Sequence, residues 1–341
     1  MTADVVPPRD VTVYDRPGKP GVIFAPPLED IGAARRWLDR CRPTLRAELL
    51  RRGHLLVRGL PVRTPEDFGV LRDVLMKKRA AYKEKATPRS AYGDDIFSST
   101  DLPPAQEIRL HNENSYTLDF PGLLVFCCLD VPDEGGATTV ADVREVLAAL
   151  PAALVERFRS VGWLLTRNFH RHIGLPWRTA FGVTSPAELE AYCKSHLIGC
   201  SWTGVEELRT MQRRPAVIHH PVTREAVWFN HAAFWSRFSL DDEIRETLVE
   251  TYGEDGLPFD TAFGDGSRLT ADEVATLNTA YDAVTRREEW RRGDLLLVDN
   301  ILSAHGREAF KGRRTILVAM GEPVLLSACG PCIPPAQEPV G

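Results

Sequence analysis

The sequence of 341 residues lacks the features that mark several large classes of protein. It contains no run of about 18 consecutive apolar residues, which a membrane-spanning helix needs. The formal net charge is −5, so the chain has no basic excess that would favour nucleic acid as a partner. The N-terminus, MTADVVPPRDVTVYDRPGKP, lacks the basic-then-apolar order of a secretory signal. The seven cysteines are odd in number and scattered, which disfavours a disulfide framework and predicts a cytoplasmic, reducing setting.

The chain does have the composition of a globular protein with a substantial core, because 43% of its residues are hydrophobic and 26% are charged. Its organisation predicts an irregular N-terminal arm at residues 1–25, a single domain at 26–322 and an irregular, Pro-rich tail at 323–341. Residues 83–104 hold scattered polar, Gly and Pro residues, which predicts a loop that could reach over a site.

Short strand patterns dominate both ends of the chain, and helical patterns fill an insertion at about 141–290. The expected helices are at 30–52 with an interruption at Pro43, 65–77 with Thr64 as cap, 141–160, 185–197, 240–252 and 270–287. The expected strands are at 54–60, 107–111, 122–129, 162–169, 214–219, 226–230, 294–300 and 314–320. A doubly wound sheet would require strands and helices to alternate throughout. The sequence therefore predicts an α+β fold with a double-stranded β-helix core, of the jelly-roll or cupin-like type, that carries helical insertions.

Three residues could together bind a metal ion. In RLHNENSY, His111 and Glu113 stand at positions i and i+2, which project from the same face of an extended strand. VDNILSAHGR supplies His305 just beyond a strongly apolar strand. Two histidines and one carboxylate with open coordination positions form the facial triad of non-haem iron(II) oxygenases. The same donors also serve zinc in hydrolases, and an isolated HxE pair is more often a surface feature of a protein without metal chemistry.

The segment GRRTILVAM offers a cation for an organic acid near the same site. An enzyme that uses 2-oxoglutarate needs a cation for the distal carboxylate, and the planar fork of arginine binds carboxylates bidentately. Arg313 and Arg314 follow His305 by eight and nine residues, and Arg314 begins an expected strand. Arg314 could therefore reach the same cavity as the metal.

Several separated segments together resemble the taurine dioxygenase/clavaminate synthase superfamily. They are HNENSY, GGATTVAD, RTMQRRPAVIHHPVTREAVWFN and WRRGDLLLVDNILSAHGREAFKGRRTILVAM, and they occur in the family's order over roughly residues 50–322. The sequence is most similar to the branch of the syringomycin-type aspartyl hydroxylase, which has HxE where taurine dioxygenase has HxD. The resemblance implies an Fe(II)- and 2-oxoglutarate-dependent dioxygenase that consumes O2 and releases succinate and CO2.

The resemblance also implies roles for individual residues. It assigns the iron to His111, Glu113 and His305, and the distal carboxylate of 2-oxoglutarate to Arg314. Thr138 falls at the position whose hydroxyl assists that arginine.

Three positions bear on the substrate, the reaction and the surroundings of the metal ligands. Val318 replaces the arginine that clamps the sulfonate in taurine dioxygenase, which disfavours a sulfonate substrate. The related halogenases have a small residue in place of Glu113, so the carboxylate indicates hydroxylation rather than chlorination. Asn300 fits either a supporting position behind the metal ligands or an ordinary turn.

The substrate implied by the resemblance is an amino acid or an amino-acid-derived metabolite in natural-product biosynthesis, of the antibiotic type. The expected reaction is hydroxylation of an unactivated C–H bond, with desaturation or epoxidation as alternatives. The sequence does not distinguish a free substrate from one bound to a peptidyl carrier protein, and it does not determine the oligomeric state. The candidate pocket residues are Asn112, Tyr116, Arg167, Phe169, Trp228, Phe229, Asn230 and His231.

Two other motifs are not expected to carry chemistry. CGPC at 329–332 is the thioredoxin redox tetrapeptide, but that motif needs a helix after it and IPPAQEPVG cannot begin one. The remaining histidines are expected to be structural or solvated: His54, His170, His172, His196, His219 and His220.

Overall fold

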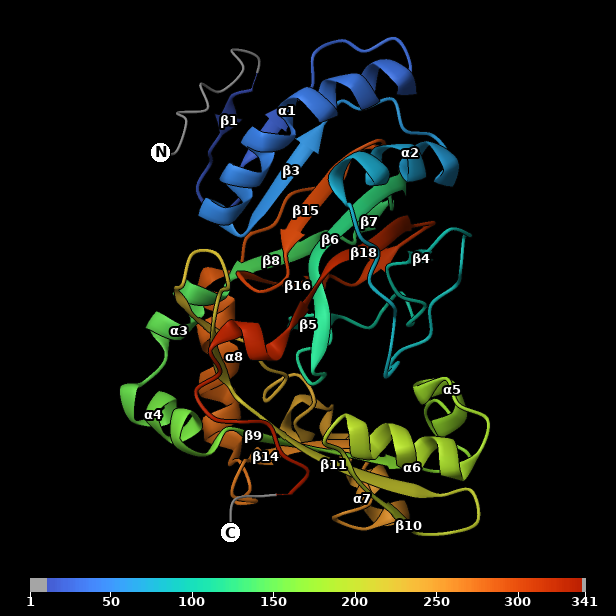
Figure 1. Ribbon diagram of the computed structural model, residues 1–341, viewed down its shortest axis with the longest axis vertical. Coiled ribbons are helices and arrows are strands. Elements are labelled where there is room, and N and C mark those ends of the chain that lie inside the picture. The colour runs from blue at the N-terminus through green and yellow to red at the C-terminus, as the bar shows by residue number, and fades with distance from the viewer. Residues whose placement is uncertain (1–10, 339–341) are drawn as a thin grey trace.

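The computed structural model describes residues 11–338 and has a mixed α and β architecture in which helices surround several sheets (Figure 1). The largest sheet has seven strands in the order β1-β2-β3-β15-β6-β18-β4. Neighbouring strands are antiparallel, except that β2 and β3 are parallel. The strands are β1 (Val13–Tyr14), β2 (Val22–Phe24), β3 (His54–Arg58), β15 (Leu295–Asp299), β6 (Asp119–Asp130), β18 (Thr315–Leu325) and β4 (Ile96–Ser98).

Both faces of this sheet are buried, and β6 shows how the sequence achieves it. Leu123 and Val125 belong to the core beneath α1 (Ile31–Arg52) and α2 (Pro65–Leu75), whereas Phe126 belongs to the core on the opposite face. Successive side chains of a strand point to opposite faces, so a continuous apolar run is required when both faces are covered. Figure 1 shows α1 and α2 lying along the outer face of the sheet.

The first helix runs from Ile31 to Arg52, which is one residue shorter at its start than the expected 30–52 and ends before Gly53 as the sequence predicts. The Asp30 side chain accepts a hydrogen bond from the Ala33 backbone at 2.7 Å, and Gly53 closes the helix with a φ of 75°. Contrary to the expected interruption, α1 continues through Pro43. Burial of its apolar face, which includes Trp37 and Leu45, outweighs the one backbone hydrogen bond that proline removes.

A smaller sheet packs against the inner face of the large one. It has three antiparallel strands in the order β5-β16-β8, and the segments just before β8 and just after β16 form a short antiparallel pair, β17-β7. Val140 of β8 and Phe126 of β6 belong to the same buried cluster, so the two sheets share a core. The strands are β5 (Ile108–His111), β16 (Ser303–Arg307), β8 (Thr138–Asp142), β17 (Phe310–Lys311) and β7 (Glu134–Gly135).

The expected helical insertion at about 141–290 is partly sheet. It contains a four-stranded antiparallel sheet in the order β10-β11-β9-β14 and the hairpin β12-β13. The expected helix at 141–160 is two helices divided at Pro151, because proline disfavours helical backbone in the residue before it. The strands are β9 (Trp163–Phe169), β10 (Gly199–Trp202), β11 (Leu208–Arg214), β12 (Val217–His219), β13 (Ala226–Trp228) and β14 (Phe259–Phe263). The helices are α3 (Val143–Ala149), α4 (Ala152–Val161), α5 (Trp177–Phe181), α6 (Pro186–Ser195), α7 (Asp242–Tyr252) and α8 (Ala271–Val284), with the 3₁₀ turns η1 (Arg237–Ser239) and η2 (Leu326–Cys329).

Both chain ends are more ordered than the sequence predicts. In the expected irregular arm, β1 and β2 extend the large sheet, and Val22 is fully buried there. In the expected tail, β18 continues to Leu325 and Ala336 pairs with Arg213 of β11. Pairing with existing strands supplies the order that the Pro-rich sequence does not provide itself. Residues 1–10 and 339–341 of the arm and tail lie outside the described residues.

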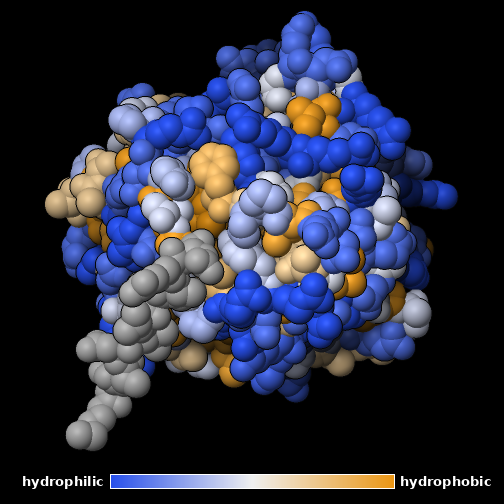
Figure 2. All heavy atoms as spheres, turned by 90° about the horizontal axis from the view of Figure 1, so that it is seen from above, coloured by the Kyte–Doolittle hydropathy of each residue, from blue (hydrophilic) through white to orange (hydrophobic). Residues whose placement is uncertain are grey.

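The view in Figure 2 shows mainly hydrophilic side chains, with hydrophobic ones confined to small separate areas. Within residues 11–338 no helix is long and apolar enough to cross a membrane.

His54 in β3 is expected to make the protein less stable in acid. Its side chain is buried and its Nδ1 lies 2.9 Å from the Ser303 hydroxyl. Burial, aided by the charge of Arg286, lowers the pKa of His54 from 6.5 to about 3. Between pH 6.5 and about pH 3, His54 is therefore protonated in the unfolded chain but neutral in the folded protein. The free energy of unfolding consequently falls as the pH is lowered through this range.

The expected contribution of His54 to the loss of stability at about pH 5 is about 2 kcal/mol. Urea unfolding near neutral pH and at about pH 5 measures it. His54→Gln should lose about 2 kcal/mol less than the wild type between the two conditions. Equal losses in both proteins would contradict the lowered pKa.

Candidate functional site

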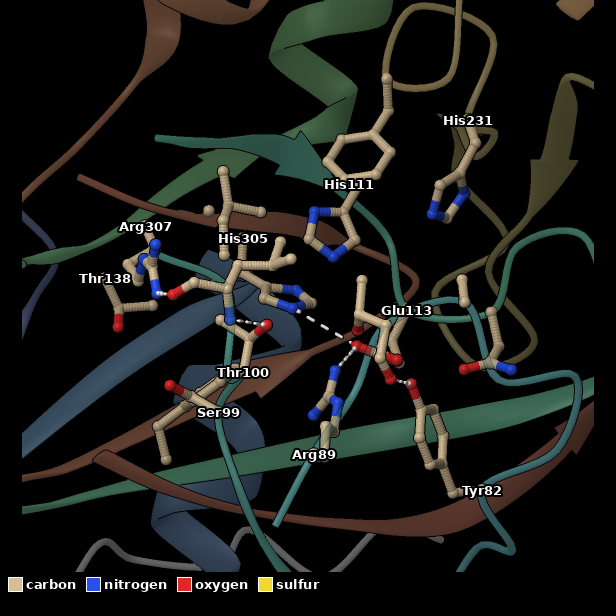
Figure 3. A pocket seen from close by; sticks show the side chains of 18 of the residues that line it. Tyr82, Arg89, Ser99, Thr100, His111, Glu113, Thr138, His231, His305 and Arg307 are labelled. Carbon is tan, nitrogen blue, oxygen red and sulfur yellow. Dashed lines mark hydrogen bonds and ion pairs between the residues drawn. The ribbon is translucent and has the colours of Figure 1, made fainter. Parts of the chain in front are cut away.

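A pocket, with about 620 Å³ of empty space that includes open solvent, lies where the two sheets of the core meet the insertion (Figure 3). As the sequence predicts, the loop at 83–104 borders it. The lining residues are Tyr82, Ala86, Thr87, Arg89, Ser99, Thr100, Leu102, Ile108, His111, Glu113, Asn114, Tyr116, Phe126, Thr138, His231, Phe234, Trp235, His305, Gly306, Arg307 and Arg314.

The two histidines of the expected triad face each other across a strand pair. His111 ends β5, and it pairs in register with His305 of the antiparallel strand β16. Their ring centroids are 4.5 Å apart, and the His111 ring also packs on Phe234 at 4.4 Å. Directly opposed residues of an antiparallel pair bring their side chains to the same face of the sheet.

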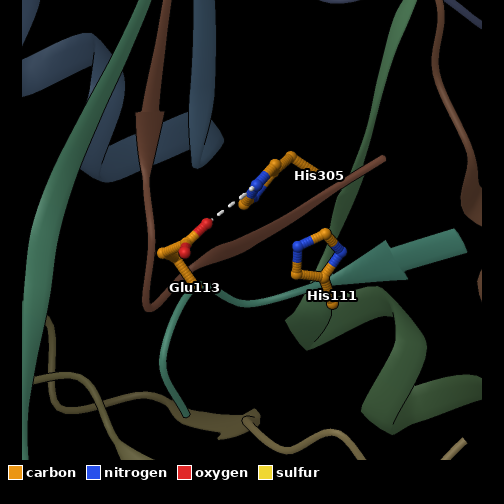
Figure 4. A group of neighbouring side chains, drawn as sticks. All are labelled: His111, Glu113 and His305. Atoms are coloured by element: carbon orange, nitrogen blue, oxygen red, sulfur yellow. Dashed lines mark ion pairs between the residues drawn. The ribbon is translucent and has the colours of Figure 1, made fainter. Parts of the chain in front are cut away.

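Glu113 completes the triad from a different local structure than expected. The strand β5 ends at His111, and Glu113 lies in the turn that follows, next to Asn114 with its φ of 56°. The separation of i and i+2 along a strand therefore does not position the carboxylate. Glu113 Oε2 nevertheless lies 3.6 Å from His305 Nε2. One ligand atom from each of His111, Glu113 and His305 lies within 4.8 Å of the others, and the three could hold a metal ion (Figure 4).

Asn300 holds the turn that carries Glu113. This fully buried side chain accepts a hydrogen bond from the Glu113 backbone N–H at 2.7 Å. Its Nδ2 donates to the carbonyls of Glu113 at 2.9 Å and Pro121 at 2.7 Å. Asn300 therefore lies in a turn itself, and its side chain holds the backbone of the candidate metal ligand Glu113.

Asn300→Ala is expected to destabilise the protein by about 3 kcal/mol, because three buried backbone groups lose their partner. Metal affinity should also fall by about 10-fold or more, as the Glu113 turn is released. Urea unfolding and Mn(II) titration measure the two effects. The matched control is Asn278→Ala, which removes a half-buried asparagine of α8 and should change neither the free energy of unfolding nor the metal affinity. Unchanged metal affinity in Asn300→Ala would contradict the positioning role.

The ionisation of the triad suits a metal cation. Burial, followed by the neighbouring His305, lowers the pKa of His111 to about 3, so its imidazole is neutral. Its Nδ1 lies 2.9 Å from the Arg109 carbonyl, which can only accept a hydrogen bond, and this leaves Nε2 with a lone pair. Burial by itself raises the pKa of Glu113, but the charge of Arg89 and the contact with His305 outweigh it and hold this pKa below its ordinary range. The residues present therefore fit a divalent metal.

A second cationic group lies at another part of the pocket. Arg314 donates from Nη2 to the Thr138 hydroxyl at 3.2 Å, from Nη1 to Ser99 at 3.1 Å and from Nε to the Gly136 carbonyl at 2.8 Å. Burial, followed by the nearby Arg307, lowers the pKa of Arg314 to about 9, which still leaves it charged at neutral pH. The expected proximity of Thr138 and Arg314 is thus found, and this part of the pocket offers a cation to an acid.

Only two of the expected substrate residues line the pocket, Tyr116 and His231. His231 contacts the Ser115 hydroxyl at 2.6 Å through Nδ1 and stacks on Trp235. Burial, followed by the charge of His111, lowers the pKa of His231 well below 6.5, so this imidazole is neutral as well.

The other expected substrate residues lie outside the pocket lining and have structural contacts. Asn112 donates to the carbonyls of Asn300 and Ser303, and Asn230 bonds the backbone at Ala216 and Ala232. The other expected substrate residues outside the pocket lining are Arg167, Phe169, Trp228 and Phe229.

Arg167 is the expected pocket residue whose observed contacts differ most clearly from the expectation. It is buried, and it donates to the backbone carbonyls of Glu84 at 3.4 Å and Lys85 at 2.9 Å. Its guanidinium also packs over Phe169 and Phe259. The long cationic side chain therefore ties the loop at 83–104 to the insertion and does not face the pocket.

Sequence reasoning missed several residues that line the pocket: Tyr82, Arg89, Phe234, Trp235 and Arg307. Arg307 stands two residues after His305 and therefore on the same face of β16, which is a signal that the spacing contained. Arg89 lies in the loop that was expected to reach the site, but nothing in its local sequence separates it from a surface arginine.

The chain matches the family described as Taurine catabolism dioxygenase TauD, TfdA family over residues 17–320. It is 33% identical over 280 residues to the dapdiamide synthesis protein DdaC of Enterobacter agglomerans, and the match covers 82% of this chain and 85% of that protein. It is 26% identical over 280 residues to a clavaminate synthase-like protein of Arabidopsis thaliana, with 79% and 81% covered.

Two solved structures illustrate the similarity of fold. PvcB of Pseudomonas aeruginosa, an Fe, alpha-ketoglutarate dependent oxygenase from an isonitrile synthetic pathway, has a TM-score of 0.51 and 15% identity, with 92% of this chain and 91% of PvcB covered. A taurine dioxygenase from Burkholderia xenovorans has a TM-score of 0.51 and 15% identity, with 94% and 92% covered. At this identity the likeness concerns the fold alone.

Proposed function

Because the chain belongs to the TauD, TfdA family of taurine catabolism dioxygenases, it is an Fe(II)- and 2-oxoglutarate-dependent dioxygenase, and we propose that it hydroxylates an unactivated C–H bond of an amino acid or amino-acid-derived metabolite. The observation that carries the proposal is the convergence of His111, Glu113 and His305, whose ligand atoms lie within 4.8 Å of one another. We assign the iron to these three residues, because two histidines and one carboxylate leave coordination positions open for co-substrate and O2.

We assign the distal carboxylate of 2-oxoglutarate to Arg314, with Thr138 and Ser99 holding the guanidinium in place. This cationic end of the pocket favours an oxygenase over a zinc hydrolase with the same ligands. Hydrolysis needs no organic-acid co-substrate next to the metal, whereas an oxygenase that decarboxylates 2-oxoglutarate to succinate and CO2 must bind one.

The bound iron supplies the oxidising chemistry, and the residues of the chain prepare its surroundings. Phe126, Phe234 and Trp235 make much of the pocket wall apolar, which keeps water from the reacting centre. Glu113 fills the position that related halogenases leave open, which favours hydroxylation over chlorination. Desaturation or epoxidation of the same substrate is the alternative outcome.

We also propose that the two facing sheets form a double-stranded β-helix core. Two features support it: the shared core of Phe126 and Val140 between the sheets, and the similarity of fold to structures of dioxygenases. Such a core places metal ligands on facing strands, where their separation is fixed by strand pairing.

The substrate class rests on a relative and on chemistry. DdaC is named for dapdiamide synthesis, which supports natural-product biosynthesis as the setting of this chain. Val318 is buried on β18, so this position offers no arginine for a sulfonate. The partner is a small molecule, either free or bound to a peptidyl carrier protein. We place the reaction in the reducing cytoplasm, in keeping with the free thiols of Cys329 and Cys332.

Two measurements test the proposed function. Under anaerobic conditions, Fe(II) and 2-oxoglutarate should together give a visible charge-transfer band that is absent in His111→Ala. Oxygen-dependent succinate formation, screened over free and carrier-bound amino acids, should then identify the substrate. Retention of zinc without a band and without oxygen uptake would instead support the hydrolase.

A further inference from the structure

The pocket contains a buried arginine that neither the metal site nor the 2-oxoglutarate site requires. The Arg89 side chain is only 6% exposed, and its Nη2 donates to Glu113 Oε2 at 2.8 Å. Its Nε and Nη1 are also buried, and neither has a hydrogen-bond partner among the described residues, although the guanidinium carbon lies 5.0 Å from the centroid of the Tyr82 ring. Figure 3 shows the guanidinium directed into the pocket beside Glu113. Buried donors without an acceptor are costly, so a ligand that accepts from them would be favoured.

The net positive charge of the side chains around the pocket also favours binding of an anion. Arg89, Arg307 and Arg314 line it, and Glu113 is the one acidic residue among the lining residues. With a divalent metal the site holds five positive charges, and Glu113 with the dianion of 2-oxoglutarate supplies three negative ones. A substrate with a carboxylate would reduce this excess, whereas a cationic substrate would increase it.

The other two arginines are held by more hydrogen bonds, and of their buried donors the Nε of Arg307 alone has no partner among the described residues. Arg314 contacts Thr138 and Ser99, and Arg307 donates to the backbone carbonyls of Leu102 and Pro103 and also to that of Gln106. Figure 3 shows Thr138 and Arg307 on one side of His305 and Arg89 on the other. Arg89 is therefore the cation on the side of His305 away from Thr138 and Arg307.

We propose that Arg89 binds a carboxylate of the substrate and so selects free acids. The inference rests on the proposed function and narrows its substrate class. Asn114 complements it, because this buried residue lines the pocket and its Oδ1 has no partner among the described residues. One group donates and the other accepts, which matches a molecule with a carboxylate and a nearby N–H, such as an amino acid or an N-acyl amino acid.

This assignment separates the two modes of substrate delivery. An amino acid bound to a carrier protein as a thioester has lost its α-carboxylate, and only a side-chain carboxylate could then reach Arg89. A free acid keeps the group. Selectivity for a carboxylate over its uncharged amide is therefore the property that Arg89 confers.

The competing role for Arg89 is to orient Glu113 for the metal, through the contact that the structure contains. The two roles predict different measurements. An orienting residue affects metal affinity and treats acids and amides alike. A substrate-binding residue affects the preference for acids and leaves metal affinity nearly unchanged.

The test uses protein loaded with Mn(II) and 2-oxoglutarate, which binds ligands without turnover. The probes are the standard L-amino acids, their N-acetyl derivatives and the primary amide of each, and binding is followed by tryptophan fluorescence and thermal shift, since Trp235 lines the pocket. In the wild type we expect at least one acid to bind at least about 100-fold more tightly than its amide.

In Arg89→Gln this preference should fall to about threefold or less, while Mn(II) affinity stays within about threefold of the wild type. Arg89→Lys retains the charge and should keep an intermediate preference, which also covers the case in which Arg89→Gln fails to fold. Arg313→Gln is the matched control, because this neighbouring arginine is 83% exposed, and it should behave as the wild type.

Three results would overturn the proposal: equal binding of acids and amides by the wild type, an acid preference that survives in Arg89→Gln, or no binding by any acid. A fall in Mn(II) affinity with an intact acid preference would assign the orienting role instead. Failure of the proposed function is distinguishable. Acid-selective binding without succinate formation contradicts amino-acid hydroxylation alone, and equal succinate formation from amides and acids contradicts the role of Arg89 alone.

Discussion

Glu113→Ala is expected to abolish substrate-dependent succinate formation and to weaken Fe(II) binding by at least about 100-fold. Glu113 is the one acidic residue among those that line the pocket, and its carboxylate lies between the His305 imidazole and the Arg89 guanidinium. Its removal takes away a ligand and leaves the cation of Arg89 unbalanced next to the metal, so two losses act in the same direction. Anaerobic Fe(II) titration and a succinate assay measure them.

Two variants control the Glu113 experiment. Glu113→Asp keeps the charge and should retain part of the metal affinity. Glu134→Ala removes an exposed glutamate that forms a surface ion pair with Lys311, and it should have no effect. The assay is run without chloride, because the alanine opens the position that halogenases use for that ion. Intact succinate formation in Glu113→Ala would contradict the assigned triad and favour a protein without metal-dependent catalysis.

Arg314→Gln is expected to raise the KM for 2-oxoglutarate by about 100-fold, with a smaller change in the affinity for Fe(II). The guanidinium is partly buried at the end of the pocket with Thr138, Ser99 and the Gly136 carbonyl, so solvent is a poor replacement for it as a partner for a carboxylate. Initial rates of succinate formation over a range of 2-oxoglutarate concentrations measure the effect.

Arg313→Gln is the matched control for Arg314, since the adjacent side chain is exposed and pairs with Asp130 at the surface. Its KM for 2-oxoglutarate should equal that of the wild type. Thr138→Ala should raise this KM by about 10-fold, because it removes one hydrogen bond made by the charged guanidinium. A wild-type KM in Arg314→Gln would mean that another cation, for which Arg307 is available, binds the co-substrate.

Several helix ends followed from local sequence signals. The capping box of Thr64 with Asp67 begins α2, and Gly53 ends α1 with a positive φ, as their residue types predict. These signals are interactions within a few residues, so a sequence contains them. The strands at the chain ends depend instead on partners far away in sequence. β2 forms beside β3, and Ala336 pairs with Arg213, so the irregular arm and tail that composition predicts were wrong at these positions.

The expected substrate residues show that local sequence also does not determine which single side chains face the pocket. VWFNHAAFW is one aromatic segment, but Trp228 and Phe229 lie in the core while Phe234 and Trp235 line the pocket. The turn after β13 divides them, and no local pattern indicates where that turn begins. Arg167 was likewise expected to meet a substrate, and it binds the backbone of the loop at 83–104.

The candidate metal site depends on both the sequence and the tertiary structure. The sequence by itself determined the donor types, since His111, Glu113 and His305 are the right atoms for a divalent metal, and Arg314 for an acid. Tertiary structure decided their geometry. Strand pairing opposes His111 to His305, and Asn300 holds Glu113 in a turn where a strand was expected. It also decided that Arg89 reaches the pocket. Chemical identity is carried by single residues, whereas distance and burial arise only when segments far apart in the chain pack together.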